Sequence, residues 1–270
     1  MTTNHSAEFH KLHQSGCFVS PNPFDAGSAR ALAALGFKAL ATTSSGFAST
    51  LGRTDHGVTL DEVLAHCRSL AESVEIPVSA DFEAGFAIEP HAVAANVAAA
   101  ARTGIAGLSV EDSTGDSFSP LFEFTLAVER IRAARKAIDE TGTGVMLVAR
   151  SEGFIAGRPD LRETIRRLTA YADAGADCLF APGIRALPDI EAVVKAVAPK
   201  PVNVVVGGGW TTVAALAAAG VRRISVGGSL ARAAWSGFLQ AAREINERGT
   251  FTGLDSAVSF AEIGRLLNPG

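Results

Sequence analysis

Short apolar runs alternate with longer amphipathic stretches along almost the whole chain. Several of the runs are continuous rather than alternating, which is typical of strands covered on both faces. Between them, apolar residues recur with helical spacing. The predicted strands are 18–21, 39–43, 78–83, 107–112, 145–152, 178–182, 202–206 and 223–227. The predicted helices are 28–35, 60–74, 91–103, 126–140, 161–174, 187–198, 213–219 and 230–248.

Eight repeated strand–helix units predict a parallel sheet, and eight strands can close into a barrel. An open, doubly wound sheet is the alternative, but it would seldom need so many even repeats. Because no linker or low-complexity segment divides residues 1–270, we predict a single α/β domain, a (β/α)8 barrel of the TIM type. An additional C-terminal helix is predicted at 256–267. The extension 250–270 that carries it must cover either the barrel floor or a neighbouring subunit.

The composition supports a large core and excludes some partners. Apolar residues make up 47% of the chain, the net charge is −4, and lysine and arginine form no run. We therefore expect no nucleic-acid and no membrane partner. The polar stretch 1–14 lacks the apolar core of a signal peptide, and its histidines are expected to be solvated. Three scattered cysteines indicate reduced thiols in a cytoplasmic protein.

Carboxylates close two successive predicted strands. Asp81 and Glu83 end the third strand and Glu111 ends the fourth. In a barrel these ends meet at the face that carries the active site. Burying an unpaired carboxylate is costly, and oxygen donors suit Mg²⁺ or Mn²⁺. The three side chains could instead cap helices or pair with arginines, but two such strands in succession favour a metal site.

Other strand ends offer groups that bind an anion. Ser44, Ser45 and Gly46 follow the second strand with hydroxyls and backbone amides, and Arg150 after the fifth could bind a carboxylate through two hydrogen bonds. The implied ligand is a small, oxygen-rich anion whose carbonyl a metal could polarise. The glycines at 207–209 and 227–229 could cradle a phosphate or only permit tight turns.

The connection 47–59 is polar, rich in glycine and long enough to act as a lid over the site. On closure Asp55, Arg53 or His56 could reach the substrate. An ordinary solvated loop is the alternative.

Four stretches, in this order, resemble the isocitrate lyase/phosphoenolpyruvate mutase superfamily, and the likeness covers nearly the whole barrel. They are 22–30 (N-P-F-D-A-G-S-A-R), 79–86 (S-A-D-F-E-A-G-F), 110–112 (V-E-D) and 149–152 (A-R-S-E). Glu83 stands where the family usually has a second aspartate. The resemblance implies Mg²⁺ held by Asp81, Glu83 and Glu111. It also implies a 2-oxo or 2-hydroxy acid bound by Arg150 and the segment 44–46, with chemistry through an enolate.

One departure bears on the reaction. Isocitrate and methylisocitrate lyases carry a K-[KR]-C-G-H loop after the E-D strand, with an acid/base cysteine, whereas residues 113–117 read S-T-G-D-S. The stretch 51–55 (L-G-R-T-D) does resemble the lid of mutase and hydrolase members, whose aspartate meets the substrate. The chain is therefore similar to a less specialised branch with 2-oxo-acid lyases, methylisocitrate lyase-like and carboxyphosphonoenolpyruvate phosphonomutase-like proteins.

These observations predict a Mg²⁺-dependent lyase that cleaves a C–C bond of a small 2-oxo or 2-hydroxy (di)carboxylic acid. Asp55 and Arg150 are the expected catalytic residues, and Ser44, Ser45, Gly46 and Asp81 are expected to bind substrate beside Arg150. P–C bond chemistry on a phosphonopyruvate-type substrate, by a mutase or hydrolase, is the first alternative. A barrel that binds a 2-oxo acid without turnover is the second. Since this superfamily commonly exchanges C-terminal helices within dimers that pair into tetramers, a homotetramer is expected.

Overall fold

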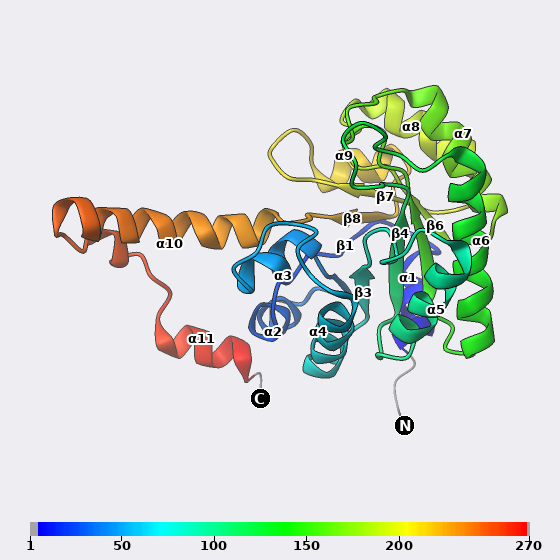
Figure 1. Cartoon of the computed structure of the whole chain (residues 1–270). Coiled ribbons are helices and arrows are strands. Elements are labelled where there is room, and N and C mark those ends of the chain that lie inside the picture. Colours follow the sequence, from blue (N-terminus) through cyan, green and yellow to red (C-terminus); the bar gives the residue numbers. More distant parts are fainter. Residues whose placement is uncertain (1–4, 269–270) are drawn as a thin grey trace.

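The predicted alternation of strands and helices is confirmed in the computed structural model, which describes residues 5–268. Residues 1–4 and 269–270, which belong to the predicted N-terminal stretch and C-terminal extension, lie outside the described residues. Eight parallel strands form one sheet, curled as in a (β/α)8 barrel, in the order β1-β8-β7-β6-β5-β4-β3-β2 (Figure 1). Their bounds are β1 Phe18–Val19, β2 Leu40–Ala41, β3 Val78–Asp81, β4 Gly107–Glu111, β5 Met146–Arg150, β6 Cys178–Phe180, β7 Val202–Val205 and β8 Arg223–Ser225.

Helices follow the strands and cover the outside of the sheet (Figure 1). Local signals set where they begin. At the start of α4 the Thr59 hydroxyl accepts a hydrogen bond from the Glu62 amide, and the Glu62 carboxylate accepts one from the Thr59 amide. The helices are α1 His5–Leu12, α2 Ala26–Ala34, α3 Ser44–Thr50, α4 Leu60–Ser73, α5 Pro90–Ala101, α6 Phe124–Thr141, α7 Leu161–Asp173, α8 Leu187–Val197, α9 Val213–Ala218, α10 Ser229–Arg248 and α11 Phe260–Leu267, with a 3-10 turn at Thr252–Leu254. No described helix is long and apolar enough to cross a membrane.

The two end strands of the sheet, β1 and β2, meet at a seam closed by Asn22. The Ala41 amide donates to the Pro21 carbonyl (3.0 Å), and the Asn22 side-chain amide donates to the Thr42 carbonyl (2.7 Å). Asn22 Oδ1 also accepts from the amides of Val226 and Gly227, at 2.8 and 2.9 Å. One side chain thus ties together the ends of β1, β2 and β8, beside the carboxylate-bearing face.

The N-terminal helix α1 closes the opposite end of the barrel. Phe9 is fully buried against residues at the starts of the strands, including Met146 and Cys178. The prediction that the N-terminal histidines are solvated is wrong for His13, which packs edge-on against Phe9 and Phe18 and donates to the Phe9 carbonyl. Burial lowers its pKa to about 3. The polar stretch hid this role because, among its described residues, Ser6, Phe9 and His13 are buried while charged and polar side chains separate them.

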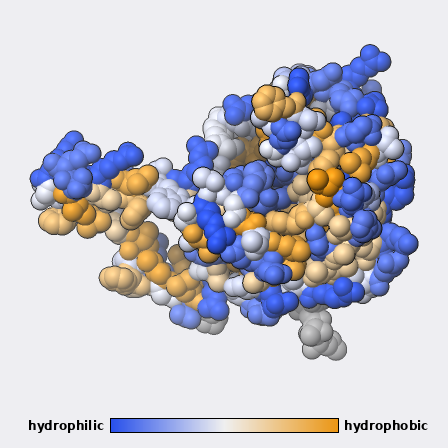
Figure 2. All heavy atoms as spheres, viewed as in Figure 1, coloured by the Kyte–Doolittle hydropathy of each residue, from blue (hydrophilic) through white to orange (hydrophobic). Residues whose placement is uncertain are grey.

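The helix after β8 leaves the barrel instead of covering it. Within α10 only Ala231 is buried, and the helix projects outward before α11 returns beside α2 (Figure 1). Large apolar side chains are exposed along both helices: Trp235 is 43% exposed, Phe238 61% and Phe260 94%. Figure 2 shows this apolar surface as an orange band along the arm. The predicted additional helix is confirmed, although it begins at Phe260.

Candidate active site at the carboxyl ends of the strands

The carboxylates predicted from the sequence lie at adjacent strand ends. Asp81 is the last residue of β3 and Glu111 the last of β4, and the two strands pair. Two residues beyond Asp81, Glu83 adopts φ +46°, an uncommon conformation for a residue with a Cβ. Its carbonyl accepts a hydrogen bond from the Glu111 amide (2.9 Å). This turn therefore holds the backbone of Glu83 against the end of β4.

Arg150, the last residue of β5, lies among these carboxylates. Its Nη1 is 3.2 Å from Asp81 Oδ1 and 3.2 Å from Glu111 Oε2, and its Nε donates to Glu152. The guanidinium carbon lies 5.3 Å from the centre of the Phe180 ring. Pairing with an arginine, the alternative that the sequence left open, is thus what the structure shows for Asp81 and Glu111.

Negative charge is in excess around Arg150. Burial raises the pKa of Glu111 to about 8, with Glu152 and Asp81 adding to the rise and Arg150 opposing it. Burial also raises the pKa of Glu152. Burial by itself would lower the pKa of Arg150, but the three neighbouring carboxylates outweigh it and the net shift is upward. A cluster of this kind favours an additional proton or an additional cation.

The lid reaches the carboxylates through His56. Its Nδ1 lies 2.9 Å from Glu83 Oε2, and this hydrogen bond raises the pKa of His56 to about 9 although partial burial opposes the shift. Asp55 is exposed and lines the mouth of the cavity. Arg53 turns back to pair with Glu62, at 2.8 Å, and so fastens the base of the lid. Of the three candidate residues on this loop, His56 contacts the carboxylate of Glu83, Asp55 borders the cavity, and Arg53 does neither.

The segment after β2 begins helix α3 at the edge of the site. The Ser44 amide donates to Asp81 Oδ2 (3.1 Å), and both Ser44 and Ser45 line the cavity. Gly46 is buried behind them. A Cβ at this position would lie 2.5 Å from Thr43 Cγ2, so only glycine fits the close approach. Gly46 does not line the cavity, and its amide donates to the Thr43 hydroxyl.

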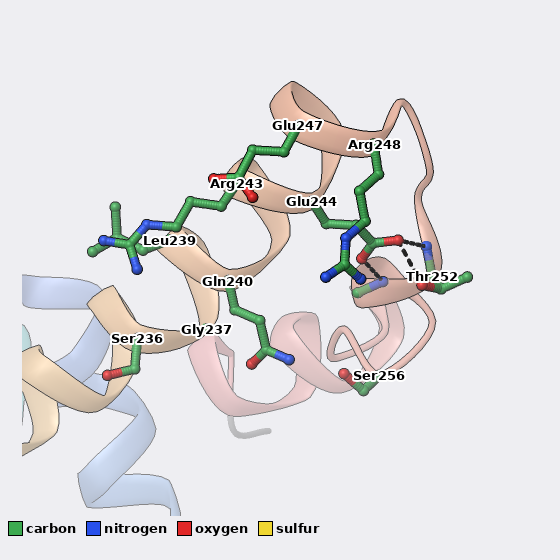
Figure 3. A pocket seen from close by; sticks show the side chains of 11 residues that line it. Ser236, Gly237, Leu239, Gln240, Arg243, Glu244, Glu247, Arg248, Thr252 and Ser256 are labelled. Carbon is green, nitrogen blue, oxygen red and sulfur yellow. Dashed lines mark hydrogen bonds between the residues drawn. The ribbon is translucent and has the colours of Figure 1, made fainter.

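A cavity of about 250 Å³ connects these groups. It runs from Asp55 and the α3 segment at the mouth, past Asp81 and Arg150, into the interior of the barrel. A larger crevice of about 770 Å³ lies on the projecting arm, where the Glu244 carboxylate accepts hydrogen bonds from the Thr252 and Gly253 amides (Figure 3). None of the predicted site residues lines that crevice. The chemistry-bearing groups therefore belong to the barrel cavity.

Two supports of Arg150, Glu152 and Asp112, lie within the motifs 149–152 and 110–112, but the sequence assigned them no role in the site. Glu152 pairs with Arg150 directly. The sequence held a signal for this contact, because residues 150 and 152 are two apart in the predicted strand 145–152 and would share a face. Asp112 holds Glu152 in place: its Oδ1 accepts from the Glu152 amide (2.7 Å), and its Oδ2 accepts from the hydroxyl of Tyr171 (2.6 Å) and from Arg167. These contacts join three elements and could not be read from spacing along the chain.

The donor set suits a hard divalent cation. Within residues 5–268, no three histidine, cysteine, aspartate or glutamate side chains are spaced to hold a metal ion, and Arg150 Nη1 bridges Asp81 and Glu111. Glu83 Oε1 is nevertheless buried with no hydrogen-bond partner. Together with the raised pKa of Glu111, this orphaned oxygen indicates that the cluster lacks positive charge.

The chain is similar to known proteins along nearly its whole length. The family model for phosphoenolpyruvate phosphomutase matches residues 9–246. An uncharacterized protein of Mycobacterium tuberculosis is 35% identical over 258 residues, which cover 94% of each chain. A Burkholderia cenocepacia protein assigned only broadly, as a lyase/mutase, is 47% identical with a TM-score of 0.94, over 98% of this chain and 95% of that one. The crystal structure of 2,3-dimethylmalate lyase is 26% identical with a TM-score of 0.86, over 100% of this chain and 95% of that one.

Proposed function

Because this chain belongs to the phosphoenolpyruvate phosphomutase family, whose superfamily includes lyases and mutases of small acids, we propose that it is a carbon–carbon lyase. Its substrate is a small 2-oxo or 2-hydroxy (di)carboxylic acid. The observation that carries this proposal is the partly buried Arg150, which lines the cavity in the middle of a carboxylate cluster. The likeness to 2,3-dimethylmalate lyase over the full chain favours C–C cleavage.

In this proposal Asp81, Glu83 and Glu111 hold Mg²⁺, or Mn²⁺ in its place. The orphaned Glu83 Oε1 and the raised pKa of Glu111 support the assignment. When bound, such an ion supplies positive charge that stabilises the enolate left as the C–C bond breaks. With that charge present, the cluster depends less on Arg150 for neutralisation.

With the cation bound, Arg150 can exchange its hydrogen bond to a protein carboxylate for a hydrogen bond to the carboxylate of the substrate. The Phe180 ring lies beside its guanidinium, where a cation–π contact favours the charged side chain. The hydroxyls of Ser44 and Ser45 border the cavity and can donate to substrate oxygens. Gly46 contributes by letting α3 begin close to Asp81 rather than by direct contact.

Asp55 is the proposed acid/base. It lies on the lid at the cavity mouth, where it can take the hydroxyl proton of a 2-hydroxy acid as the C–C bond breaks. Its backbone neighbour His56 is hydrogen-bonded to Glu83, so lid position and acidic cluster are linked. Asp55→Asn should therefore lose activity, while the matched change Asp61→Asn, on the exposed first turn of α4, should not.

A substrate panel tests the proposal. Oxaloacetate, malate, methylisocitrate and phosphonopyruvate would be incubated with the purified chain, with Mg²⁺ or with EDTA, and the products followed by NMR. We expect a C–C cleavage product from a dicarboxylic acid that disappears with EDTA. Turnover of phosphonopyruvate alone would contradict the lyase assignment, and binding without any turnover would leave only a binding barrel.

We also propose that the arm mediates assembly, with α10 and α11 exchanged between copies in a dimer that pairs into a tetramer. The exposed Trp235, Phe238 and Phe260 support it, as does an apolar groove of about 300 Å³ between α3 and α10. Light scattering should find an oligomer at low micromolar concentration, and removal of the residues after Gly249 should shrink it. A full-length monomer would contradict exchange.

The free thiols of Cys17, Cys67 and Cys178 support a reducing, cytoplasmic setting.

A further inference from the structure

A second arginine lies deeper in the same cavity, and this one is buried. Arg223 is the first residue of β8, is 3% exposed, and lines the cavity together with Arg150. Its Nε donates to Asn203 Oδ1 (2.8 Å), and Asn203 Nδ2 donates to the Ser225 hydroxyl (3.1 Å). This chain of hydrogen bonds fixes the guanidinium inside the barrel.

Strand register separates the two arginines in depth. Arg150 pairs with Phe180 on β6, Phe180 with Asn203 on β7, and Asn203 with Arg223 on β8. Because barrel strands tilt, a row of paired residues descends as it passes round the barrel. Arg150 ends its strand and Arg223 begins its own, so Arg223 is the deeper of the two.

Arg223 lacks a compensating negative charge. Among residues 5–268, no ion pair includes it, and its Nη1 is buried with no hydrogen-bond partner. The adjacent Cys178 thiol is neutral, because burial raises its pKa to about 11, and His13 is neutral as well, because burial lowers its pKa to about 3. A buried cation in such surroundings is costly.

Arg130 shows how this fold satisfies a buried arginine when no ligand is involved. Arg130 is 1% exposed, and its guanidinium donates to the backbone carbonyls of Ala84, Ala87 and Ile88. Arg223 has no comparable set of acceptors at Nη1. The cavity wall between Arg150 and Arg223 instead presents the hydroxyls of three serines, Ser79, Ser109 and Ser225.

We propose that Arg223 forms the floor of an anion-binding subsite, separate from the group that Arg150 binds. The subsite accepts one small anion of carboxylate or halide size, with the serine hydroxyls as further donors. The anion is either the distal carboxylate of the substrate, which makes the substrate a dicarboxylic acid, or a free monovalent ion. Only the first source rests on the proposed lyase function.

Calorimetry with matched ligands tests the carboxylate source. Malate and lactate share a 2-hydroxy acid group, and malate adds a second carboxylate. In the Mg²⁺-supplied full chain, malate should bind at least tenfold more tightly than lactate. Arg223→Met should reduce this ratio to near one and change lactate affinity less than threefold. The matched control Arg222→Met removes the neighbouring arginine, which donates outward to the Gly16 carbonyl, and should keep the ratio.

Bromide tests the free-ion source with the unaltered protein, so it remains decisive if Arg223→Met fails to fold. Crystals grown in sodium bromide should show an anomalous peak within hydrogen-bond distance of Arg223 Nη1 if a free ion is the ligand. A malate-to-lactate ratio that does not depend on Arg223, together with no bromide at Nη1, overturns the proposal. If neither malate nor lactate binds, the lyase function fails, and the bromide result alone decides the subsite.

Discussion

The two ends of the barrel interior each hold an arginine, and the electrostatic settings of the two arginines are opposite. At the carboxyl ends of the strands, Arg150 contacts Asp81, Glu111 and Glu152. At the other end, Arg223 has a neutral amide as its partner and leaves Nη1 unpaired. The first end is open to solvent through the lid, whereas α1 closes the second with Phe9 and His13.

The contrast shows that the cavity carries excess negative charge at its mouth and an unpaired positive charge at its floor. Excess carboxylate at the mouth attracts a cation, and an unpaired guanidinium at the floor attracts an anion. A substrate that meets a cation with its 2-oxo or 2-hydroxy acid end and reaches Arg223 with a distal carboxylate would satisfy both. Substitutions at the mouth are expected to have the largest effects, and substitutions at the closed end the smallest.

Replacing Asp81 with asparagine should have the largest effect. Asp81 contacts both Arg150 and the Ser44 amide and is a proposed cation ligand. We expect kcat/KM at saturating Mg²⁺ to fall by about 100- to 1,000-fold, the scale of losing one group that stabilises developing charge. The melting temperature without Mg²⁺ should hold or rise, because the cluster loses a negative charge. Activity within threefold of the unaltered protein would contradict the assignment of Asp81.

Arg150→Lys should have an intermediate effect. A lysine keeps the charge but cannot reproduce the planar fork that now meets several carboxylates. Productive binding should weaken by about 1–3 kcal/mol, the scale of a charge-assisted hydrogen bond, and KM should rise accordingly. Arg166→Lys, at an exposed pair on α7, is the matched control and should leave KM unchanged. An unchanged KM in Arg150→Lys would remove Arg150 from substrate binding.

Much of this arrangement could be predicted from the sequence. The strands are continuous apolar runs, so their order along the chain followed directly. Asp81, Glu111 and Arg150 were predicted near strand ends, although the observed strands stop one or two residues before the predicted ends at 83, 112 and 152. The contact between His56 and Glu83 could not be predicted from the sequence. It depends on the backbone of two separate segments, the lid at His56 and the turn after β3 at Glu83, and both residues have positive φ. Arg223 was not predicted as a site residue, because a charged residue at the start of a strand is expected to be exposed to solvent.

The closed end should show the smallest effect, on stability rather than activity. Burial lowers the pKa of His13 from 6.5 to about 3, so the unfolded chain takes up the proton first as the pH falls. The stabilising contribution is complete above pH 6.5 and declines from there toward pH 3; at pH 5 the loss is about 2 kcal/mol.

Urea unfolding of the wild type and His13→Phe at pH 7.5 and pH 5 measures this loss. The variant should lose about 2 kcal/mol less between the two pH values. His66, whose pKa burial lowers to about 4, contributes equally to both proteins and cancels. Equal losses in both proteins would mean that His13 is not buried in neutral form.

Anomalous scattering from Mn²⁺ can show whether the acidic end of the barrel binds a divalent cation, as the proposed lyase function requires. Crystals of the full chain would be soaked in millimolar Mn²⁺ and measured at the manganese edge. We expect an anomalous-difference peak between the side chains of Asp81, Glu83 and Glu111. A map with no peak there, or with its principal peak elsewhere, would contradict it.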